Sequence, residues 1–485
     1  MTWPVGLKAS FLLRALASRR GIGFRIRADV REGVMETSPT HSFNRNVAIL
    51  FGAVLLALSI AAGLRAPLAY DGSYFLFRVL DSRQLMVPHG RIVYIPIQLA
   101  ALIAAHFSDS VQVIGLIFSG VTASVPALGL LVSWLVCRRR PSLFLWPAIA
   151  ICIIKLPGLM FFTSQQRLAV TLMWPALLTS LVGAAPATLA SVAILALVGT
   201  LSHPNTAILL LIALFAAIAN AKVRPTRRKQ SLWFGSFLLL LLIVRIAIPL
   251  DVWEKSSLTS IVVRSSFYNA VLGWPLVGIA AALLASLSCL LPGRRSGGIL
   301  LILPLIVAGL ALIVWAIRVE NWASCIDYRY WDAPFSMLLM AGAIVDGLRS
   351  DSAELERQSA RLYAFPVIGA TFLAVLSIQS VEWKQIGDQL RAQLVGDASG
   401  CEAANSVDWL QRTPLDHWSL TFYAVELQGR APATLLLPTL LDCQRFAHSG
   451  DAVMALQDEF QYVRTRRAGW FNFEPAMANA HSAKP

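Results

Sequence analysis

Residues 299–318 read ILLILPLIVAGLALIVWAIR, an apolar run that ends at Arg318. Because an α-helix rises about 1.5 Å per residue, such a run is long enough to cross the roughly 30 Å hydrocarbon core of a bilayer. Arg294 and Arg295 precede the run and are separated from it by a short Ser-Gly-Gly segment. Cations of this kind gather at the cytoplasmic ends of membrane helices. The stretch therefore predicts a transmembrane helix that starts on the cytoplasmic side.

Ten further apolar runs give the chain the composition of a membrane protein. Of its 485 residues, 56% are hydrophobic and 14% are charged, whereas a soluble domain usually carries about 25% charged residues. This excludes a soluble enzyme, a secreted disulfide scaffold and a disordered chain. The other runs are 46–66, 111–136, 143–163, 167–183, 186–201, 205–221, 231–250, 267–290, 332–348 and 362–380. The sequence thus predicts an all-α polytopic membrane protein with about eleven transmembrane helices.

The positions of lysine and arginine predict how these helices are oriented. Short basic clusters occur in the segment before residue 46, at Arg138–Arg140, at Lys222–Lys229, at Arg294–Arg295, and at Arg349 with Arg357 and Arg361. All of them lie on the cytoplasmic side, as basic loops usually do, only if residues 92–107 do not cross the membrane. That segment is broken by Pro96, so we expect an interfacial or re-entrant helix on the outer side. If it does cross, one basic cluster falls on the outer face.

Three regions follow from this topology. Residues 1–45 form a basic cytoplasmic arm, 46–380 form the membrane core with a first external loop at 67–110, and 381–485 form a small extracytoplasmic domain of α or α+β type. Met35 is an alternative start, because the residues after it suffice as a lead-in to the first helix. The net charge of +14 resides in the arm and core, since residues 381–485, which we call the tail, have more acidic than basic residues. We attribute this charge to topology and to lipid headgroups, and expect the bilayer rather than nucleic acid as a partner.

The six cysteines divide by location. Three fall in or beside apolar runs and are predicted to pack in the core, namely Cys137, Cys152 and Cys289. The other three face outside, where disulfides persist. A bridge between Cys401 and Cys443 is the preferred pairing, which leaves Cys325 over. No spacing of cysteine and histidine resembles a zinc site.

The first external loop contains a carboxylate in an aromatic setting. Asp71 stands in Tyr70-Asp71-Gly72-Ser73-Tyr74, shortly after the first apolar run, and the loop continues through Asp81 to His89 and Arg91. A carboxylate that is partly desolvated there gains basicity and suits a general base. The alternative is an exposed Asp in a Tyr-Asp-Gly-Ser turn.

Four cationic or basic residues are expected on the same outer side. Lys155 lies inside an apolar run beside Pro157-Gly158, and an intramembrane cation is a functional candidate. Arg167, His203 and Arg329 occur at the starts of later runs. Structural alternatives are snorkelling for Lys155 and Arg167, a hydrogen-bonded turn for His203 and an aromatic belt around Arg329. Together, one carboxylate and several cations fit transfer from a lipid-phosphate sugar, where a base activates the acceptor and cations neutralise the leaving phosphate.

The order and rough spacing of five segments resemble those of the GT-C membrane glycosyltransferases. The likeness is to the branch of protein O-mannosyltransferases and bacterial lipid A aminoarabinose and core-sugar transferases. The five segments are Tyr70–Tyr74, His89–Pro96, Ser164–Arg167, His203-Pro204 and Arg329–Pro334. They correspond to an acidic motif in the first external loop, a juxtamembrane segment, a polar stretch ending in Arg, a basic residue before Pro, and an Arg-Tyr pair before a late span.

The resemblance implies a GT-C-like fold in a bacterial inner membrane and an inverting reaction. Its donor is a polyprenyl-phosphate sugar, and its acceptor is a periplasmic glycan, lipid or protein. Asp71 is then the catalytic base. The residues that correspond to donor-phosphate ligands are Arg329, His203, Arg167 and Lys155. The residues that correspond to substrate contacts are Tyr74, Asp81, His89, Arg91 and Tyr330.

One departure from the family concerns metal. Relatives often have a second acid where this chain has Gly72, so no metal ligands are assigned here and dependence on a divalent metal stays open. No other cofactor is expected. Two other classes remain as alternatives. A transporter or flippase of lipid-linked saccharides fits the interrupted run at Pro157-Gly158, although the chain has no internal repeat. A saccharide polymerase usually has its large loop between late spans, whereas here the large polar part is terminal.

Overall fold

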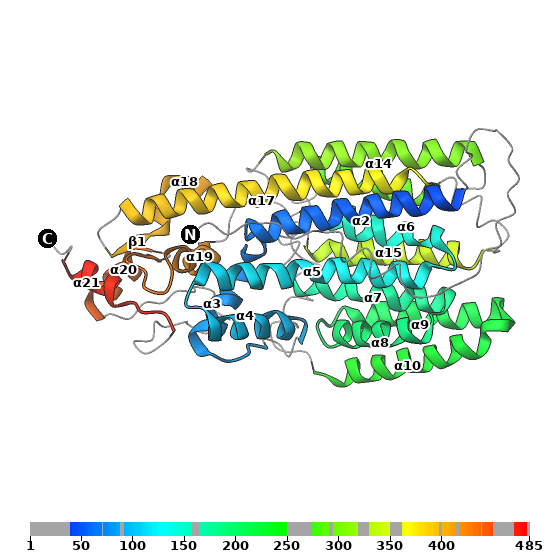
Figure 1. Cartoon of the computed structure of the whole chain (residues 1–485), viewed down its shortest axis with the longest axis horizontal. Coiled ribbons are helices and arrows are strands. Elements are labelled where there is room, and N and C mark those ends of the chain that lie inside the picture. The colour runs from blue at the N-terminus through cyan, green and yellow to red at the C-terminus, as the bar shows by residue number, and fades with distance from the viewer. Residues whose placement is uncertain are drawn as a thin grey trace, which may run out of the picture. The chain divides into compact units, whose positions relative to one another are not determined.

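The computed structural model describes residues 39–69, 71–87, 92–157, 164–249, 273–290, 294–318, 329–349, 361–396, 400–412, 417–437, 439–449 and 470–482. Within these ranges the chain is a bundle of helices with one small sheet (Figure 1). The prediction of an all-α membrane protein is confirmed at this level. Cys325, His89 and Arg91 lie outside the described residues.

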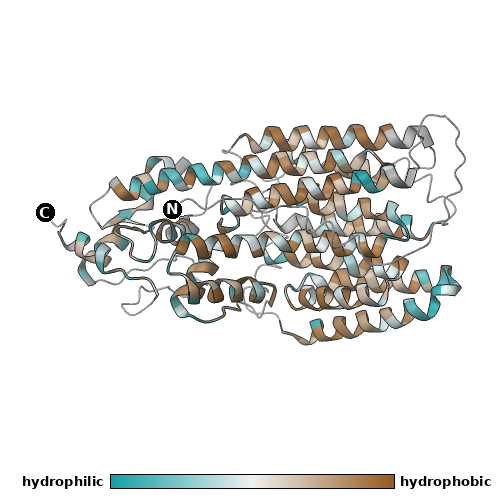
Figure 2. Ribbon diagram, in the orientation of Figure 1, coloured by the Kyte–Doolittle hydropathy of each residue, from teal (hydrophilic) through white to brown (hydrophobic). Residues whose placement is uncertain are grey.

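Six described helices are long and apolar enough to cross a membrane. They correspond to predicted runs and are α2 (Pro39–Gly63), α5 (Val111–Cys137), α9 (Thr206–Val223), α10 (Arg228–Ala247), α14 (Arg294–Ala316) and α17 (Ala364–Gly396). Figure 2 shows apolar residues along most of the length of these helices, with hydrophilic residues concentrated toward their ends.

The other predicted runs form shorter or more polar helices. The run at 143–163 is divided into η4 (Pro141–Phe144), α6 (Leu145–Ile149) and a π-helical turn, η5 (Ala150–Ile154). The remaining helices in this group are α7 (Gln165–Val182), α8 (Pro186–Thr200), α13 (Trp274–Ser288) and α15 (Arg329–Gly347), with η7 (Pro225–Arg227) before α10. Residues 92–107 form η3 (Ile92–Tyr94) and α4 (Ile95–Phe107), a short apolar helix.

Helix α7 lies at the centre of the bundle, and each of its residues is buried. It packs against α5, α8, α9 and α15. A helix that is apolar around its whole circumference is stable only when other helices surround it. The packing is close, since a Cβ on Gly129 of α5 would lie 2.6 Å from Thr171 Cγ2.

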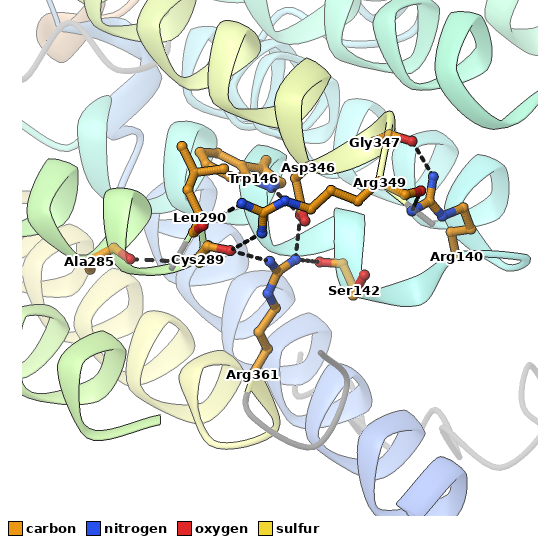
Figure 3. Close-up of polar contacts among 10 residues, drawn as sticks. All are labelled: Arg140, Ser142, Trp146, Ala285, Cys289, Leu290, Asp346, Gly347, Arg349 and Arg361. Carbon is orange, nitrogen blue, oxygen red and sulfur yellow. Dashed lines mark hydrogen bonds and ion pairs between the residues drawn. The ribbon is translucent and has the colours of Figure 1, made fainter. Parts of the chain in front are cut away.

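A buried cluster of charged residues joins several helix ends (Figure 3). Asp346, in the last turn of α15, accepts hydrogen bonds at Oδ2 from Trp146 Nε1 at 2.9 Å and from Arg361 Nη1 at 2.7 Å. Arg361 also donates to the backbone carbonyls of Ser142 at 2.9 Å and Cys289 at 3.1 Å. The carboxylate therefore compensates the charge of a buried arginine.

Three more arginines bind carbonyls at the same helix ends. Arg224 donates to the carbonyls of Gly347 and Arg349, both at 3.0 Å, and Arg140 donates to the same two carbonyls. Arg349 in turn donates to the carbonyl of Cys289 at 3.3 Å. Cations stabilise the C-terminal ends of helices. We refer to Arg140, Trp146, Arg224, Asp346, Arg349 and Arg361 as the Asp346 cluster.

The described residues of the tail belong to the same compact unit as the core. Residues 39–485 form one compact unit, and the predicted boundary at 381 falls inside α17. Beyond α17 come β1 (Cys401–Ala403), η11 (Ala404–Ser406), α18 (Asp408–Arg412), α19 (His417–Gln428), β2 (Leu435–Leu437), α20 (Leu440–Ser449) and α21 (Glu474–Ser482). The two strands pair in parallel, with Cys401 opposite Leu435.

The predicted disulfide is confirmed. Cys401 in β1 is bonded to Cys443 in α20, with their Cα atoms 5.6 Å apart. The three cysteines predicted to pack in the core, Cys137, Cys152 and Cys289, are buried. The tail also contacts the core directly, since Arg430 pairs with Asp109 at 2.6 Å.

Candidate functional site

The segment predicted as the first external loop, residues 67–110, is largely helical in its described part. It begins with η1 (Ala66–Leu68), and α3 (Asp71–Ser82) follows, so the backbone at Asp71 starts a helix instead of forming an isolated turn. Tyr74 is 7% exposed, and its ring centroid lies 5.3 Å from that of Phe422 in α19. Asp81, near the end of α3, is half-buried. The helix forms here because its apolar side chains are covered by the tail.

Helix α3 connects to the central helix through η3. The rings of Phe75 in α3 and Tyr94 in η3 lie 4.4 Å apart, and Tyr94 is fully buried. Segment η3 in turn contacts both α7 and α8. The first loop is therefore packed against the bundle.

Lys155 and Arg167 lie together and bind each other's backbone. Lys155 Nζ donates to the carbonyl of Arg167 at 2.7 Å and to Thr171 Oγ1 at 2.5 Å. Arg167 donates from Nη1 to the carbonyl of Lys155 at 3.1 Å and from Nη2 to that of Pro157 at 2.8 Å. Both side chains are 1% exposed, so neither extends to the surface of the protein as snorkelling requires. Lys155 follows the π-helical turn η5, a type of irregularity that is frequent at functional sites.

His203 occupies the short turn between α8 and α9 and is half-buried. Its Nδ1 accepts a hydrogen bond from the backbone N–H of Asn205 at 3.2 Å, and its carbonyl accepts one from Thr206 Oγ1 at 2.5 Å. A Cβ on Gly199, four residues earlier, would lie 3.2 Å from the carbonyl oxygen of Ala169. The end of α8 that leads into this turn therefore packs against the first half of α7.

Arg329 and Tyr330 begin α15, which packs along α7. A Cβ on Gly347, at the end of α15, would lie 2.9 Å from Leu181 near the end of α7. The two helices thus run in the same direction, and Arg329 starts its helix at the end where Arg167 lies. The side chains of Asp71, Arg329 and Tyr330 are outside the described residues.

The candidate residues lie at the opposite end of the bundle from the Asp346 cluster. Arg224 of that cluster donates to the carbonyl of Leu181, in the last turn of α7, at 3.4 Å. Because α7 has 18 residues, its other end is about 27 Å away. We call this other end, with α3, η3, the start of α7 and the α8–α9 turn, the distal end. The structure brings Lys155 and Arg167 into contact and places Tyr74, Asp81 and His203 at the same end.

Two residues at the distal end were missed by sequence reasoning. Glu426 of α19 is 1% exposed, and neither of its carboxylate oxygens has a hydrogen-bond partner among the described residues. Burial raises the pKa of this carboxyl well above its usual range, and the positive charge of Arg65 offsets only part of that effect. Arg65, between α2 and η1, has a φ of 57°, which is uncommon for a residue other than glycine.

The sequence contains a sign of the buried acid. Residues 420–427 read LTFYAVEL, and an acid in an apolar segment with no polar face must be buried if the segment folds as a helix.

Among the described residues, no three His, Cys, Asp or Glu side chains lie close enough to hold a metal ion. Comparison of the chain with protein-family models, with curated proteins and with solved structures gave no match.

Proposed function

We propose that this chain is a membrane glycosyltransferase that transfers a sugar from a polyprenyl-phosphate donor to an acceptor hydroxyl outside the cytoplasm. The observation that supports it most is the pairing of two buried cations, Lys155 and Arg167, at the distal end. Helix α3, which begins at Asp71, also lies at that end. One carboxylate and several cations at one end of a bundle are the groups that this transfer requires.

In the proposed reaction Asp71 accepts the proton of the acceptor hydroxyl. The acceptor oxygen forms a bond to the anomeric carbon while the bond from that carbon to the phosphate oxygen breaks. The electron pair of the broken bond leaves on the phosphate, and the configuration at the anomeric carbon is inverted. Arg329 and His203 bind the phosphate oxygens, and the Lys155–Arg167 pair contributes positive charge to the same end of the site.

We further propose eleven crossings of a bacterial inner membrane, with residues 1–45 in the cytoplasm and the tail in the periplasm. Residues 92–107 then remain on the outer side. The Asp346 cluster supports this arrangement, because its arginines come from loops after α5, α9 and α15, which all end on the cytoplasmic side in the proposed topology. The Cys401–Cys443 bridge also suits an oxidising compartment.

A transporter or flippase of lipid-linked saccharides is the alternative. The π-helical turn η5 and the break at Pro157, beside a buried lysine, are features that transporters place at their substrate sites. Such a protein moves the lipid-linked sugar across a bilayer without breaking the sugar–phosphate bond.

A reconstituted system separates the two functions. Purified protein in lipid vesicles is incubated with polyprenyl-phosphate donors that carry different radiolabelled sugars, together with periplasmic acceptor fractions. The proposal predicts that label moves to an acceptor and that free polyprenyl phosphate appears in equal amount. Movement of intact donor between leaflets without release of polyprenyl phosphate would favour the flippase, and the absence of transfer from every donor would contradict the proposal.

A further inference from the structure

Glu426 is a buried acid for which the described part of the fold supplies no hydrogen bond. It lies on α19, where Phe422, Tyr423 and Leu427 are buried as well. Both carboxylate oxygens are inaccessible to solvent and accept no hydrogen bond from any residue that the structure describes. Burial of such a group without a partner destabilises a protein, so its presence requires an explanation.

A neighbouring cation, Arg65, does not form a hydrogen bond with this acid. Arg65 is close enough for its charge to affect the Glu426 carboxyl, yet neither oxygen of that carboxyl accepts a hydrogen bond from it. The backbone of Arg65 is in the left-handed region, at a φ of 57°. Backbone conformations of this kind cost free energy and concentrate where ligands are bound. The Glu426 carboxyl therefore lies within electrostatic range of Arg65 without accepting a hydrogen bond from it.

Aromatic rings lie beside this pair. Tyr423, one turn before Glu426, is 2% exposed, and its ring centroid lies 4.5 Å from that of Trp383 in α17. Helices α17 and α19 meet closely there, since a Cβ on Gly387 would lie 2.6 Å from Tyr423 Oη. The acid is therefore surrounded by aromatic side chains where α17 and α19 pack together.

The location relative to Asp71 follows from two contacts along α19. Phe422 touches Tyr74 of α3, whereas Glu426, one turn further along α19, interacts with Arg65. Asp71 lies between Arg65 and Tyr74 in the chain, so α19 passes alongside the segment that contains it. Glu426 therefore lies on a helix that packs against α3, the helix that begins at Asp71.

We propose that Glu426 and Arg65 bind hydroxyl groups of the sugar carried by the lipid donor. This inference rests on the proposed function and adds a residue that recognises the substrate. A neutral carboxylic acid both donates and accepts hydrogen bonds, and a guanidinium only donates. Neighbouring hydroxyls of a sugar match both groups, since each hydroxyl can donate and accept. An amine would be repelled by Arg65, and a phosphate would leave the carbonyl oxygen of the acid without a donor.

The test compares binding of two lipids to the full chain in vesicles. The probes are a set of polyprenyl phosphates carrying different hexoses or pentoses, and the same polyprenyl phosphate without sugar. For the preferred sugar, Glu426→Leu is expected to weaken binding about tenfold, and Glu426→Gln by roughly two- to threefold, because an amide retains one donor and one acceptor. Binding of the bare lipid phosphate is expected to stay unchanged. The matched control is Glu474→Gln, which changes an exposed acid of the tail.

Thermal unfolding distinguishes a substrate-binding role from a structural one. If the carboxyl serves a ligand, Glu426→Leu raises the Tm of the ligand-free protein, since it removes an unsatisfied buried group. A lower Tm together with unchanged sugar affinity would overturn the inference. So would a wild-type protein that binds every sugar-bearing lipid no better than the bare one. If Glu426-dependent sugar binding is found without transfer, the inference stands and the transferase proposal fails.

Discussion

Lys155 and Arg167 place two positive charges inside the bundle, and each side chain donates a hydrogen bond to the backbone carbonyl of the other residue. Replacement of Lys155 by Met keeps most of the volume but leaves the carbonyl of Arg167 and the hydroxyl of Thr171 with one donor fewer. We expect Lys155→Met to lower the free energy of unfolding by about 1–3 kcal/mol. Thermal unfolding in detergent measures this. Lys384→Met is the control, because Lys384 forms an exposed pair with Asp388 that contributes little. Equal Tm values for the two variants would show that the buried lysine has no such role.

Glu426 makes stability depend on pH in a direction that can be worked out. Its pKa is raised above the usual value of 4.5 in the folded protein, so above that pH the unfolded chain loses this proton while the folded chain retains it. The free energy of unfolding therefore falls as pH rises from about 4.5 toward the raised pKa, by up to about 1.4 kcal/mol per pH unit. Chemical unfolding at several pH values is expected to show a smaller decline in Glu426→Gln than in wild type. A decline identical to that of wild type would exclude Glu426 as its source.

At the level of elements, the Asp346 cluster joins several helix ends, and its one carboxylate binds Trp146 and Arg361. Asp346→Asn leaves Arg361 buried without its counter-charge, and removal of one partner of a buried ion pair costs about 3–5 kcal/mol. The variant is expected to unfold at a clearly lower denaturant concentration than wild type. Asp388→Asn, which breaks an exposed pair on α17, is expected to have almost no effect. Comparable midpoints for these two variants would show that the cluster does not hold the helix ends.

The elements also show what a sequence reveals. Long apolar runs predicted α2, α5, α9, α10, α14 and α17, because hydropathy reports directly on length and apolar surface. Hydropathy did not predict that α17 continues to Gly396. The polar residues after 380 mark the end of an apolar run but not the end of a helix. Segment α3 was read as a loop because its helix depends on packing against α19, a contact between residues more than 300 positions apart.

The site was only partly predictable for the same reason. The sequence predicted Lys155 and Arg167 as candidate residues, but their mutual hydrogen bonds depend on the break after η5, which composition does not reveal. The Cys401–Cys443 pairing was predictable because few cysteines were expected outside the membrane. Glu426 was missed, since its burial follows from how the tail packs on the core.

For the whole molecule, the Cys401–Cys443 disulfide links β1 to α20 in the tail, over a separation of 42 residues. Loss of a native disulfide typically costs about 2–5 kcal/mol. Because residues 39–485 form one compact unit, loosening of the tail is expected to expose α3 as well. Cys443→Ser and reduced wild type are expected to be cleaved in the tail by added protease several-fold faster than oxidised wild type. If oxidised and reduced protein are cleaved at one rate, the bridge does not hold the tail on the core.

The proposal for the whole molecule depends most directly on Asp71. Transfer of labelled sugar from a lipid-phosphate donor is measured for wild type, Asp71→Asn and, as a control, Asp408→Asn, which changes an exposed acid of α18. Asn is nearly isosteric with Asp but cannot take a proton. We predict that Asp71→Asn lowers the rate about 100-fold or more, as expected for loss of a general base, and that Asp408→Asn transfers at the wild-type rate. Transfer by Asp71→Asn at the wild-type rate would contradict the assignment of Asp71 as the base.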